Sequence, residues 1–458
     1  MRLALASTLL NGSMFRRGII ALAQEKYCAI PTEVGLDYAQ LLVASLHFEK
    51  RENRFRIVML VLGIIAVIGL LAQNVLIGGM TILAMVIVQL GKSYKERFVY
   101  PAMFNRNTFH QDNELKLFNS NYDGSKYRKD LGAKQNVTIY KDFNPFSIAG
   151  VDMGGWSFSI DTTRPSKSLT SDKHVDEFGL YDIYGFMEKS IKSLGMNNVS
   201  VTDHFFINGV DIPLFKEILP ALYITPNQHF GDKQTAEFQL NADSLRHYKW
   251  IQVKDWGNDL VLSFFLRFEL KGHNLFVEVS KALLTPISNS YRKIDNYLAP
   301  SFANNIFWFS GTILKTPFSF LASVVYSYLN LTQGISNLFG FSDRNAKKQI
   351  RNDPLFNYGS GESLRVKMSS DKYSHYFQKM DKELYSKTIE KTILESIIDF
   401  LEQHNIDISE LRDTQSNIVN SGIIVQGGDV NTNNLAVGKG AKASMSNVVN
   451  KVKSKVAA

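Results

Sequence analysis

The sequence predicts an α+β protein with an N-terminal transmembrane helical hairpin, a cytosolic mixed α+β domain with antiparallel hairpins, and a C-terminal helix followed by a short β tail. Three observations lead to this fold class: a charge-free stretch near the N-terminus, alternating strands in the middle of the chain, and a long amphipathic helix near its end. With 458 residues, 45% of them hydrophobic, the chain can form two or three units with proper cores. A mean hydropathy of −0.10 excludes a protein that lies mostly within a membrane.

The charge-free stretch predicts the membrane hairpin. No charged residue lies between Arg56 and Lys92. A single helix of this length would measure about 50 Å, well beyond a hydrocarbon core of about 30 Å. Polar residues interrupt the stretch at 73–74, so we expect one helix at about 57–72 and a second at about 75–90. The alternative, a buried hairpin inside a soluble domain, is disfavoured by the length of the charge-free run.

Basic residues flank this hairpin on both outer sides, and its turn carries no charge. The positive-inside rule therefore places the N-terminus and the C-terminus in the cytoplasm. The single cysteine, Cys28, agrees with a reducing compartment. Residues 1–55 open with a short apolar run, but Arg16 and Arg17 stand where a signal cleavage site would be, so we expect an amphipathic cytosolic segment. The flanking residues are Lys50, Arg51, Arg54, Arg56, Lys92, Lys95 and Arg97.

A charged connector at 93–135 leads into the α+β domain, which we place at 136–300. Apolar residues alternate with polar ones from Trp156 to Ile160, as in a half-buried strand. The apolar positions of 260–270 and 275–279 predict two antiparallel strands around a short polar turn. Asn208-Gly209, between two apolar runs, predicts a further compact hairpin.

An aromatic and apolar region follows at 301–345, in which Lys315 is the only charged residue before Asp343. Pro317 interrupts it. Two interpretations remain open: a third membrane span, or a surface helix or helix pair that lies against the bilayer or another subunit. The second is favoured because polar residues are frequent.

The chain ends with a helical segment at 346–410 and a β tail with a basic terminus at 411–458. Short β runs in the tail cannot form a core alone, so we expect them to pair with a second copy or a partner protein. The tail thus predicts an assembly element and a homo-oligomer. Its candidate residues are Ile423, Ile424, Val425, Gly427, Gly428, Leu435, Val437 and Gly438.

The sequence contains few residues arranged as a catalytic or ligand-binding motif. The histidines are scattered, which argues against a metal site, and no cofactor-binding motif is found, so we expect no metal and no cofactor. Asp203 beside His204 could be an acid–base pair, but neighbours in a strand point to opposite faces, so we assign no catalytic residue. The basic tail lacks interleaved aromatic residues, which argues against nucleic acid as a partner. A turn or pocket is expected around Pro145, Phe146, Gly150 and Trp156.

Several short motifs, spread over nearly the whole chain, carry a wider resemblance. They are Val34–Asp37, Asn144–Phe146, Trp156–Phe158, Leu260–Arg267, Leu284–Pro286, Tyr291-Arg292, Ser363–Arg365, Gly427-Gly428 and Leu435–Gly438. In their order and spacing the chain is similar to a family of uncharacterised bacterial membrane proteins, best represented in actinobacteria. The resemblance implies a bacterial cytoplasmic (inner) membrane and no known enzymatic role. The chain departs from the family pattern at Ser147-Ile148-Ala149, before Gly150.

Together these patterns favour a non-enzymatic membrane protein whose cytosolic domain binds or senses a partner. One concrete form is a membrane effector in bacterial antiphage defence, because the tail is similar to short β segments on proteins of bacterial conflict systems. Two alternatives stay open: an enzyme anchored at the membrane with its pocket in 136–300, or a scaffold that binds lipid or nucleic acid.

Overall fold

The computed structural model describes residues 1–107, 109, 127–128, 130–166, 174–239, 244–297, 302–338, 341–409 and 411–412. The chain forms two compact units, each built from three segments. The first unit comprises Met1–Ile148, Phe206–Lys233 and Pro286–Asp371, and the second comprises Ala149–Phe205, Gln234–Thr285 and Lys372–Ala458. The predicted α+β class is confirmed.

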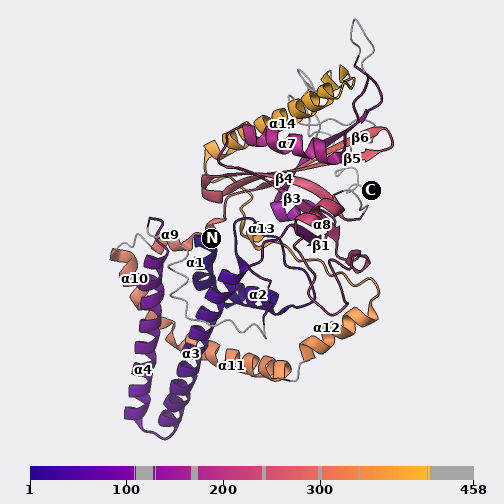
Figure 1. The fold of residues 1–458 in the computed structure, drawn as a ribbon. Helices are drawn as coiled ribbons and strands as arrows, with labels where there is room; N and C mark the ends of the chain where they lie inside the picture. Colours follow the sequence, from indigo (N-terminus) through magenta and orange to yellow (C-terminus); the bar gives the residue numbers. More distant parts are fainter. Residues whose placement is uncertain are drawn as a thin grey trace, which may run out of the picture. The chain divides into compact units, whose positions relative to one another are not determined.

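The first unit is mainly helical (Figure 1). Besides its helices it holds the short strand β1, Val137–Tyr140. Its short 3₁₀ elements are η2 (Pro145–Ala149), η3 (Ile212–Leu214) and η5 (Asn289–Tyr291). Its helices are α1 (Arg2–Leu10), α2 (Gly12–Gln24), α3 (Tyr38–Leu71), α4 (Val75–Tyr94), the π-helix η1 (Lys95–Val99), α5 (Tyr100–Met103), α9 (Lys293–Tyr297), α10 (Phe302–Leu314), α11 (Thr316–Leu338), α12 (Phe341–Asn352) and α13 (Leu364–Met368).

The N-terminal segment forms two helices because the chain turns at Gly12, whose φ of +81° suits glycine. Leu3 and Leu5 of α1 are buried, and they join a core that also contains Leu41 and Leu42 of α3. The first helix is therefore an internal element of this unit.

Helices α3 and α4 form the predicted hairpin. The side chain of Asp37 accepts hydrogen bonds from the backbone nitrogens of Ala39 (2.8 Å) and Gln40 (3.3 Å), so α3 begins at Tyr38 and continues through the basic stretch. The helices are separated by a tight turn in which Gln73 has a φ of +55°. The side chain of Asn74 then caps α4. The predicted position of the turn is confirmed.

The second unit is a sheet covered by helices. Its strands follow the spatial order β3-β4-β5-β6-β2, and the end of β3, from Phe206, belongs to the first unit beside β1. The elements are β2 (Val151–Asp161), α7 (Leu180–Ser193), β3 (Val199–Asn208), α8 (Asp232–Phe238), β4 (Arg246–Asp255), η4 (Trp256–Asn258), β5 (Leu260–Lys271), β6 (Asn274–Leu284) and α14 (Tyr376–Gln403).

The predicted strand pair is the centre of this sheet. Strands β5 and β6 are antiparallel from Val261–Leu284 to Lys271–Asn274. The alternate residues of β5 from Leu260 to Phe268 pack with Ile183 of α7 and Ile393 of α14 in one hydrophobic core. In Figure 1 α7 and α14 lie together over the sheet.

The hairpin predicted at Asn208-Gly209 is wrong. Strand β3 ends at Asn208, and the chain continues into the 3₁₀ helix η3. A Cβ atom at Gly209 would lie 2.1 Å from the backbone nitrogen of Gly359, so the glycine permits a close approach between chain segments. The Asn-Gly pair serves tertiary packing, not a two-residue strand connection.

Candidate membrane-facing site

The two helices of the hairpin approach each other closely near their turn. A Cβ atom added at Gly69 would lie 3.0 Å from the backbone nitrogen of Gly78. One added at Gly78 would lie 2.9 Å from a methyl carbon of Leu70. Small residues at such positions let membrane helices pack backbone to backbone.

The outer faces of the hairpin are apolar and exposed. Two helices of the described chain, Tyr38–Leu71 and Val75–Met103, are long and apolar enough to cross a membrane. Contiguous apolar surface of this extent marks a membrane or an interaction partner. The exposed apolar residues of the hairpin are Ile57, Val58, Val61, Ile64, Ile65, Val67, Ile68, Leu70, Leu71, Val75, Leu76, Ile77, Met80, Ile82, Leu83 and Ile87.

The predicted flanking residues gather at the end of the hairpin opposite its turn, where ion pairs join the two helices. Nζ of Lys92 lies 2.8 Å from the carboxylate of Glu52, and Nε of Arg56 lies 3.4 Å from it. Arg51 and Glu96 form a further pair, at 3.8 Å. We call the seven basic residues the basic collar: Lys50, Arg51, Arg54 and Arg56 on α3, Lys92 on α4, and Lys95 and Arg97 on η1.

Three members of the basic collar remain available to outside anions. Lys50, Arg54 and Lys95 are exposed, and none has an ion-pair partner within the described chain. Lys50 and Arg54 are four residues apart and therefore share one face of α3. Exposed cations beside an exposed apolar band suit the anionic headgroups of a bilayer.

A cavity of about 260 Å³ opens within the collar, between α3 and α4. Charged side chains of both signs line one part of it, and apolar groups line the rest. The lining residues are Arg51, Glu52, Phe55, Val88, Gly91, Lys92 and Lys95.

The four residues predicted for a turn or pocket are divided between the units. Pro145 and Phe146 lie in η2 of the first unit, where the Phe146 ring meets that of Phe206 edge to face at 5.2 Å. In the second unit, Gly150 precedes β2 with a φ of +102°, and Trp156 is 3% exposed within the core. None of the four lines the cavity within the collar or a larger cavity around Arg128 in the first unit.

The sequence did not reveal a polar cluster on the sheet of the second unit. Nε2 of His247 lies 2.8 Å from Asp203, and Nζ of Lys249 lies 2.9 Å from the same carboxylate and 2.6 Å from Glu188 of α7. His204 points to the other face, where its ring meets Trp250 at 4.9 Å. The signal that could have shown the cluster is the period-2 spacing of positions 247 and 249 in β4.

Burial and hydrogen bonding set the charges of this cluster. Burial raises the pKa of Asp203, but hydrogen bonds from His247 and Lys249 outweigh it and bring the pKa to about 2. Burial lowers the pKa of His247, although Asp203 partly offsets this effect. The ion pairs of Lys249 with Glu188 and Asp203 join α7 to the sheet.

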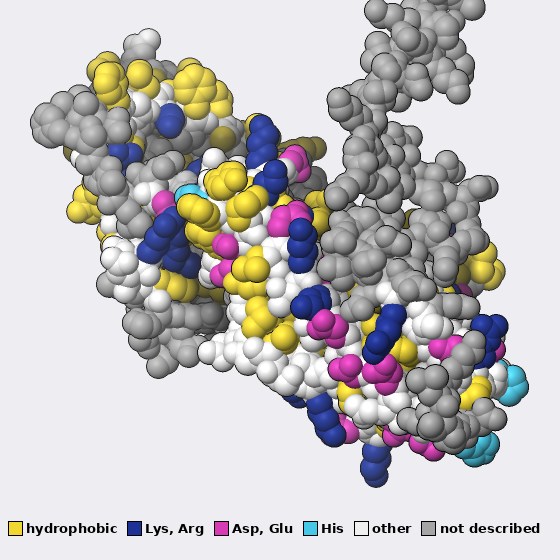
Figure 2. Space-filling model, turned by 90° about the horizontal axis from the view of Figure 1, so that it is seen from above, with side chains coloured by type: hydrophobic (Ala, Val, Ile, Leu, Met, Phe, Trp, Pro, Cys, Tyr) yellow, Lys and Arg dark blue, Asp and Glu magenta, His cyan; other side chains and the backbone are white. Residues whose placement is uncertain are grey.

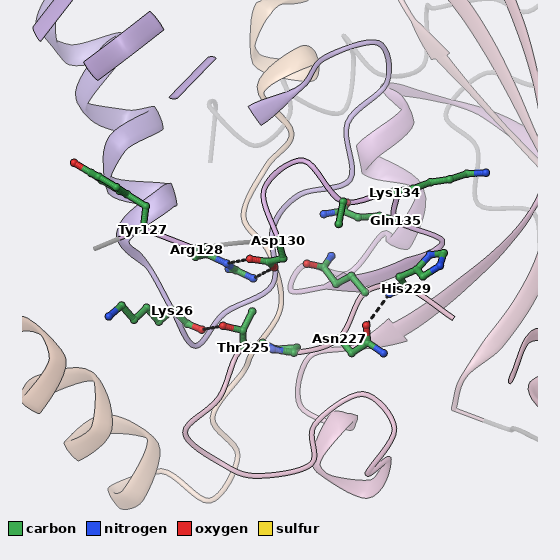
Figure 3. Close-up of a pocket in the computed structure, with 12 residues that line it drawn as sticks. Lys26, Tyr127, Arg128, Asp130, Lys134, Gln135, Thr225, Asn227 and His229 are labelled. Atoms are coloured by element: carbon green, nitrogen blue, oxygen red, sulfur yellow. Dashed lines mark hydrogen bonds and ion pairs between the residues drawn. The ribbon is translucent and has the colours of Figure 1, made fainter. Parts of the chain in front are cut away.

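A larger cavity, of about 520 Å³, lies in the first unit. Arg128 is held by Asp130 at 2.6 Å. In Figure 3 the ends of the Lys26 and Lys134 side chains point away from each other, so the cations do not converge on one ligand position. The lining residues are Lys26, Tyr127, Arg128, Asp130, Ala133, Lys134, Gln135, Thr225, Pro226, Asn227, Gln228 and His229.

The described part of one face of the molecule carries charges of both signs. Figure 2 shows Lys and Arg side chains interspersed with Asp and Glu on the described part of one face, whereas a nucleic-acid interface typically has clustered positive charge. In the described ranges no group of three or more His, Cys, Asp or Glu side chains is placed to hold a metal. The predicted assembly residues, from Ile423 to Gly438, lie outside the described residues.

Comparisons with known proteins give one match. A family model described as an AbeC-like domain matches residues 155–432. No curated protein and no solved structure matches the chain.

Proposed function

The chain belongs to the AbeC-like domain family, and from this premise we propose that it is a membrane-anchored effector of antiphage defence of the abortive-infection type. It acts through the bilayer of the bacterial cytoplasmic membrane, and not by catalysis. The matched residues begin after the hairpin, so the AbeC-like domain binds or senses the partner that signals infection, while the hairpin responds in the membrane.

The exposed apolar surface of α3 and α4 carries this proposal. Ile64 is 47% exposed and Ile68 is 60% exposed on a helix whose last four turns contain no charge. Burial of such side chains in lipid stabilises by about 25 cal/mol per Å² of apolar surface, whereas exposure to water forgoes this gain. The basic collar then favours an orientation in which both termini are cytoplasmic.

The test is phage challenge of bacteria that express the full-length chain. We expect fewer plaques than with an empty vector, and a loss of membrane potential in infected cells, measured with a potential-sensitive dye. Ile64→Asp places a charge at the centre of the apolar half of α3, where insertion costs about 3 kcal/mol more. This variant should leave the membrane fraction after an alkaline wash and should lose protection.

Leu355→Asp is the matched control, because Leu355 is 71% exposed and lies outside the hairpin. It should remain in the membrane fraction and protect normally. Unchanged plaque counts across a broad phage panel, together with an unchanged membrane potential, would refute the defence role. Release of the wild-type chain by the alkaline wash would refute its membrane anchoring.

A further inference from the structure

Helices α10 and α11 lie against the hairpin instead of standing apart from it. Helix α10 packs on α4 and α11 packs on α3, within the first unit (Figure 1). The contacts of four side chains place this helix pair relative to the basic collar: Asn305, Trp308, Phe320 and Tyr326.

The start of α10 lies at the level of the collar. The guanidinium group of Arg97 donates hydrogen bonds to the side-chain oxygen of Asn305, at 3.0 and 3.2 Å. One turn later, the ring of Trp308 meets Phe98 edge to face at 5.6 Å and lies 5.6 Å from the Arg97 guanidinium carbon. Tryptophan beside arginine is typical of the boundary between headgroups and acyl chains.

The beginning of α11 lies at the level of the charge-free segment of α3. A Cβ atom at Gly63 would lie 2.1 Å from the ring of Phe320, so this ring occupies the notch that the missing side chain leaves on α3. Gly63 is seven residues beyond Arg56, or about 10 Å along the helix axis. Half of a hydrocarbon core measures about 15 Å. Phe320 therefore touches α3 well inside its charge-free segment.

Further along, α11 returns to the collar. The ring of Tyr326 lies under two guanidinium groups, with its centroid 3.2 Å from the Arg56 carbon and 4.1 Å from the Arg17 carbon. Its hydroxyl donates a hydrogen bond to Glu49. The two cation–π contacts and the charge-assisted hydrogen bond hold Tyr326 at the level of the basic collar.

The outward side of the pair continues the apolar surface of the hairpin. Beneath this surface, the buried hydroxyls of Thr312 and Ser323 donate hydrogen bonds to carbonyls of their own helices, at 2.7 and 2.6 Å, which satisfies them without water. Lys315, which joins the two helices, is the only charged residue of 302–338, and its flexible stem can carry the ammonium toward the headgroups. The exposed apolar residues are Phe307, Phe309, Ile313, Leu314, Phe318, Leu321, Val324, Val325 and Tyr328.

We propose that α10 and the first half of α11 form a re-entrant helix pair that enters and leaves the leaflet on the side of the basic collar. The partner of its outward surface is the acyl-chain layer of that leaflet, because this surface is continuous with that of the hairpin. Both ends are fixed at the collar, by Asn305 and Tyr326, and Phe320 marks the inserted part. The inference rests on the membrane insertion of α3 and α4 proposed above.

Depth-dependent quenching of a fluorophore tests the proposal on the full-length chain. Cys28→Ser removes the single thiol of the chain. Leu321→Cys, Ile65→Cys or Leu355→Cys then gives one labelling site for an environment-sensitive probe, in vesicles of phosphatidylcholine and phosphatidylglycerol. We expect the probe at 321, like that at 65, to be quenched by lipids with spin labels on the acyl chain and shielded from iodide. The probe at 355 should show the reverse.

The outcomes separate the two proposals. If the probe at 65 is quenched by lipid but the probe at 321 is quenched only by iodide, the hairpin is inserted and the re-entrant pair is refuted. If the probe at 65 is not quenched by lipid, the membrane insertion itself fails.

A second pair of variants tests how the helix pair is held. Gly63→Leu fills the notch that Phe320 occupies and should reduce lipid quenching at 321 while leaving quenching at 65 unchanged. Gly79→Leu is the matched control, because no atom lies within 4 Å of a Cβ atom at Gly79. Equal lipid quenching at 321 in both variants would contradict the claim that the contact of Phe320 with Gly63 holds α11 against α3.

Discussion

Lys249 is the residue on which the polar cluster of the second unit depends. Its side chain is 7% exposed and pairs with Glu188 and Asp203, whereas Lys192 is 64% exposed and, within the described residues, forms an ion pair with Glu188 only, at 2.5 Å. The two lysines therefore offer a comparison of a buried and an exposed ion pair on the same carboxylate.

Lys249→Met should destabilise the protein by about 1–3 kcal/mol, because it leaves two carboxylates close together without their shared cation. This loss of stability is smaller than the loss for a fully buried pair, because both carboxylates keep contact with water. Lys192→Met should leave the thermal midpoint of the full-length protein in detergent unchanged. Equal midpoints for the two variants would show that the buried pair contributes no more than the exposed one.

His204 should make stability depend on pH. Burial lowers its pKa to about 3, below the usual 6.5, so the folded form is neutral where the unfolded form is charged. The contribution of neutral His204 to the free energy of unfolding is fully present above pH 6.5. It decreases by about 1.4 kcal/mol per pH unit as the pH falls toward 3. His247, whose pKa burial also lowers, acts in the same direction.

His204→Phe keeps an aromatic ring against Trp250 and removes the titrating group. When the pH is lowered from 6.5 to 4, the thermal unfolding midpoint of this variant should therefore decrease less than that of the wild type. Tryptophan fluorescence of the full-length chain measures both midpoints, with Trp250 close to the substitution. Parallel pH profiles for the two proteins would exclude His204 as a source of the dependence.

At the level of elements, the hairpin depends on one of its two adjacent glycines. Gly78 faces α3, whereas a Cβ atom at Gly79 meets nothing within 4 Å. Gly78→Leu should separate the helices and cost about 1–3 kcal/mol, as overpacking generally does. Gly79→Leu should be close to neutral, and the thermal midpoint in detergent compares them. A larger loss for Gly79→Leu would mean that this glycine faces a partner helix.

The helices of the second unit follow from their own sequence patterns. Ile389, Ile393 and Ile397 recur at helical spacing in α14, and all three are fully buried. Strand β5 has the period-2 pattern, and its alternate residues from Leu260 enter the same core. Such elements are predictable because the side chains that they bury lie close together in the chain.

For the whole molecule, assembly is the property that the tail predicts. We expect the full-length protein to form an oligomer in detergent and a chain ending at Asn420 to lose it, because that chain lacks the β segments expected to pair between copies. A chain ending at Gly438 keeps those segments, loses only the basic terminus, and should assemble normally. Light scattering gives the masses. A single-chain mass for the full-length protein would contradict assembly in detergent.

The sequence by itself determined the apolar helical hairpin, its turn at Gln73-Asn74 and the antiparallel pair β5–β6. Each depends on a local pattern: a charge-free run too long for one helix, a polar interruption, or alternation across a short turn. These patterns act between neighbours in the chain, so one sequence is enough to read them.

Only the tertiary structure decided which distant residues meet. The carboxylate of Glu33 accepts hydrogen bonds from Ser363 and from the backbone of Leu364, more than 300 residues later in the chain, at 2.9 and 2.5 Å. Asp203 pairs with His247 instead of its neighbour His204 because strand geometry turns adjacent side chains to opposite faces. Such contacts depend on packing between elements, and no local pattern in the sequence encodes that packing.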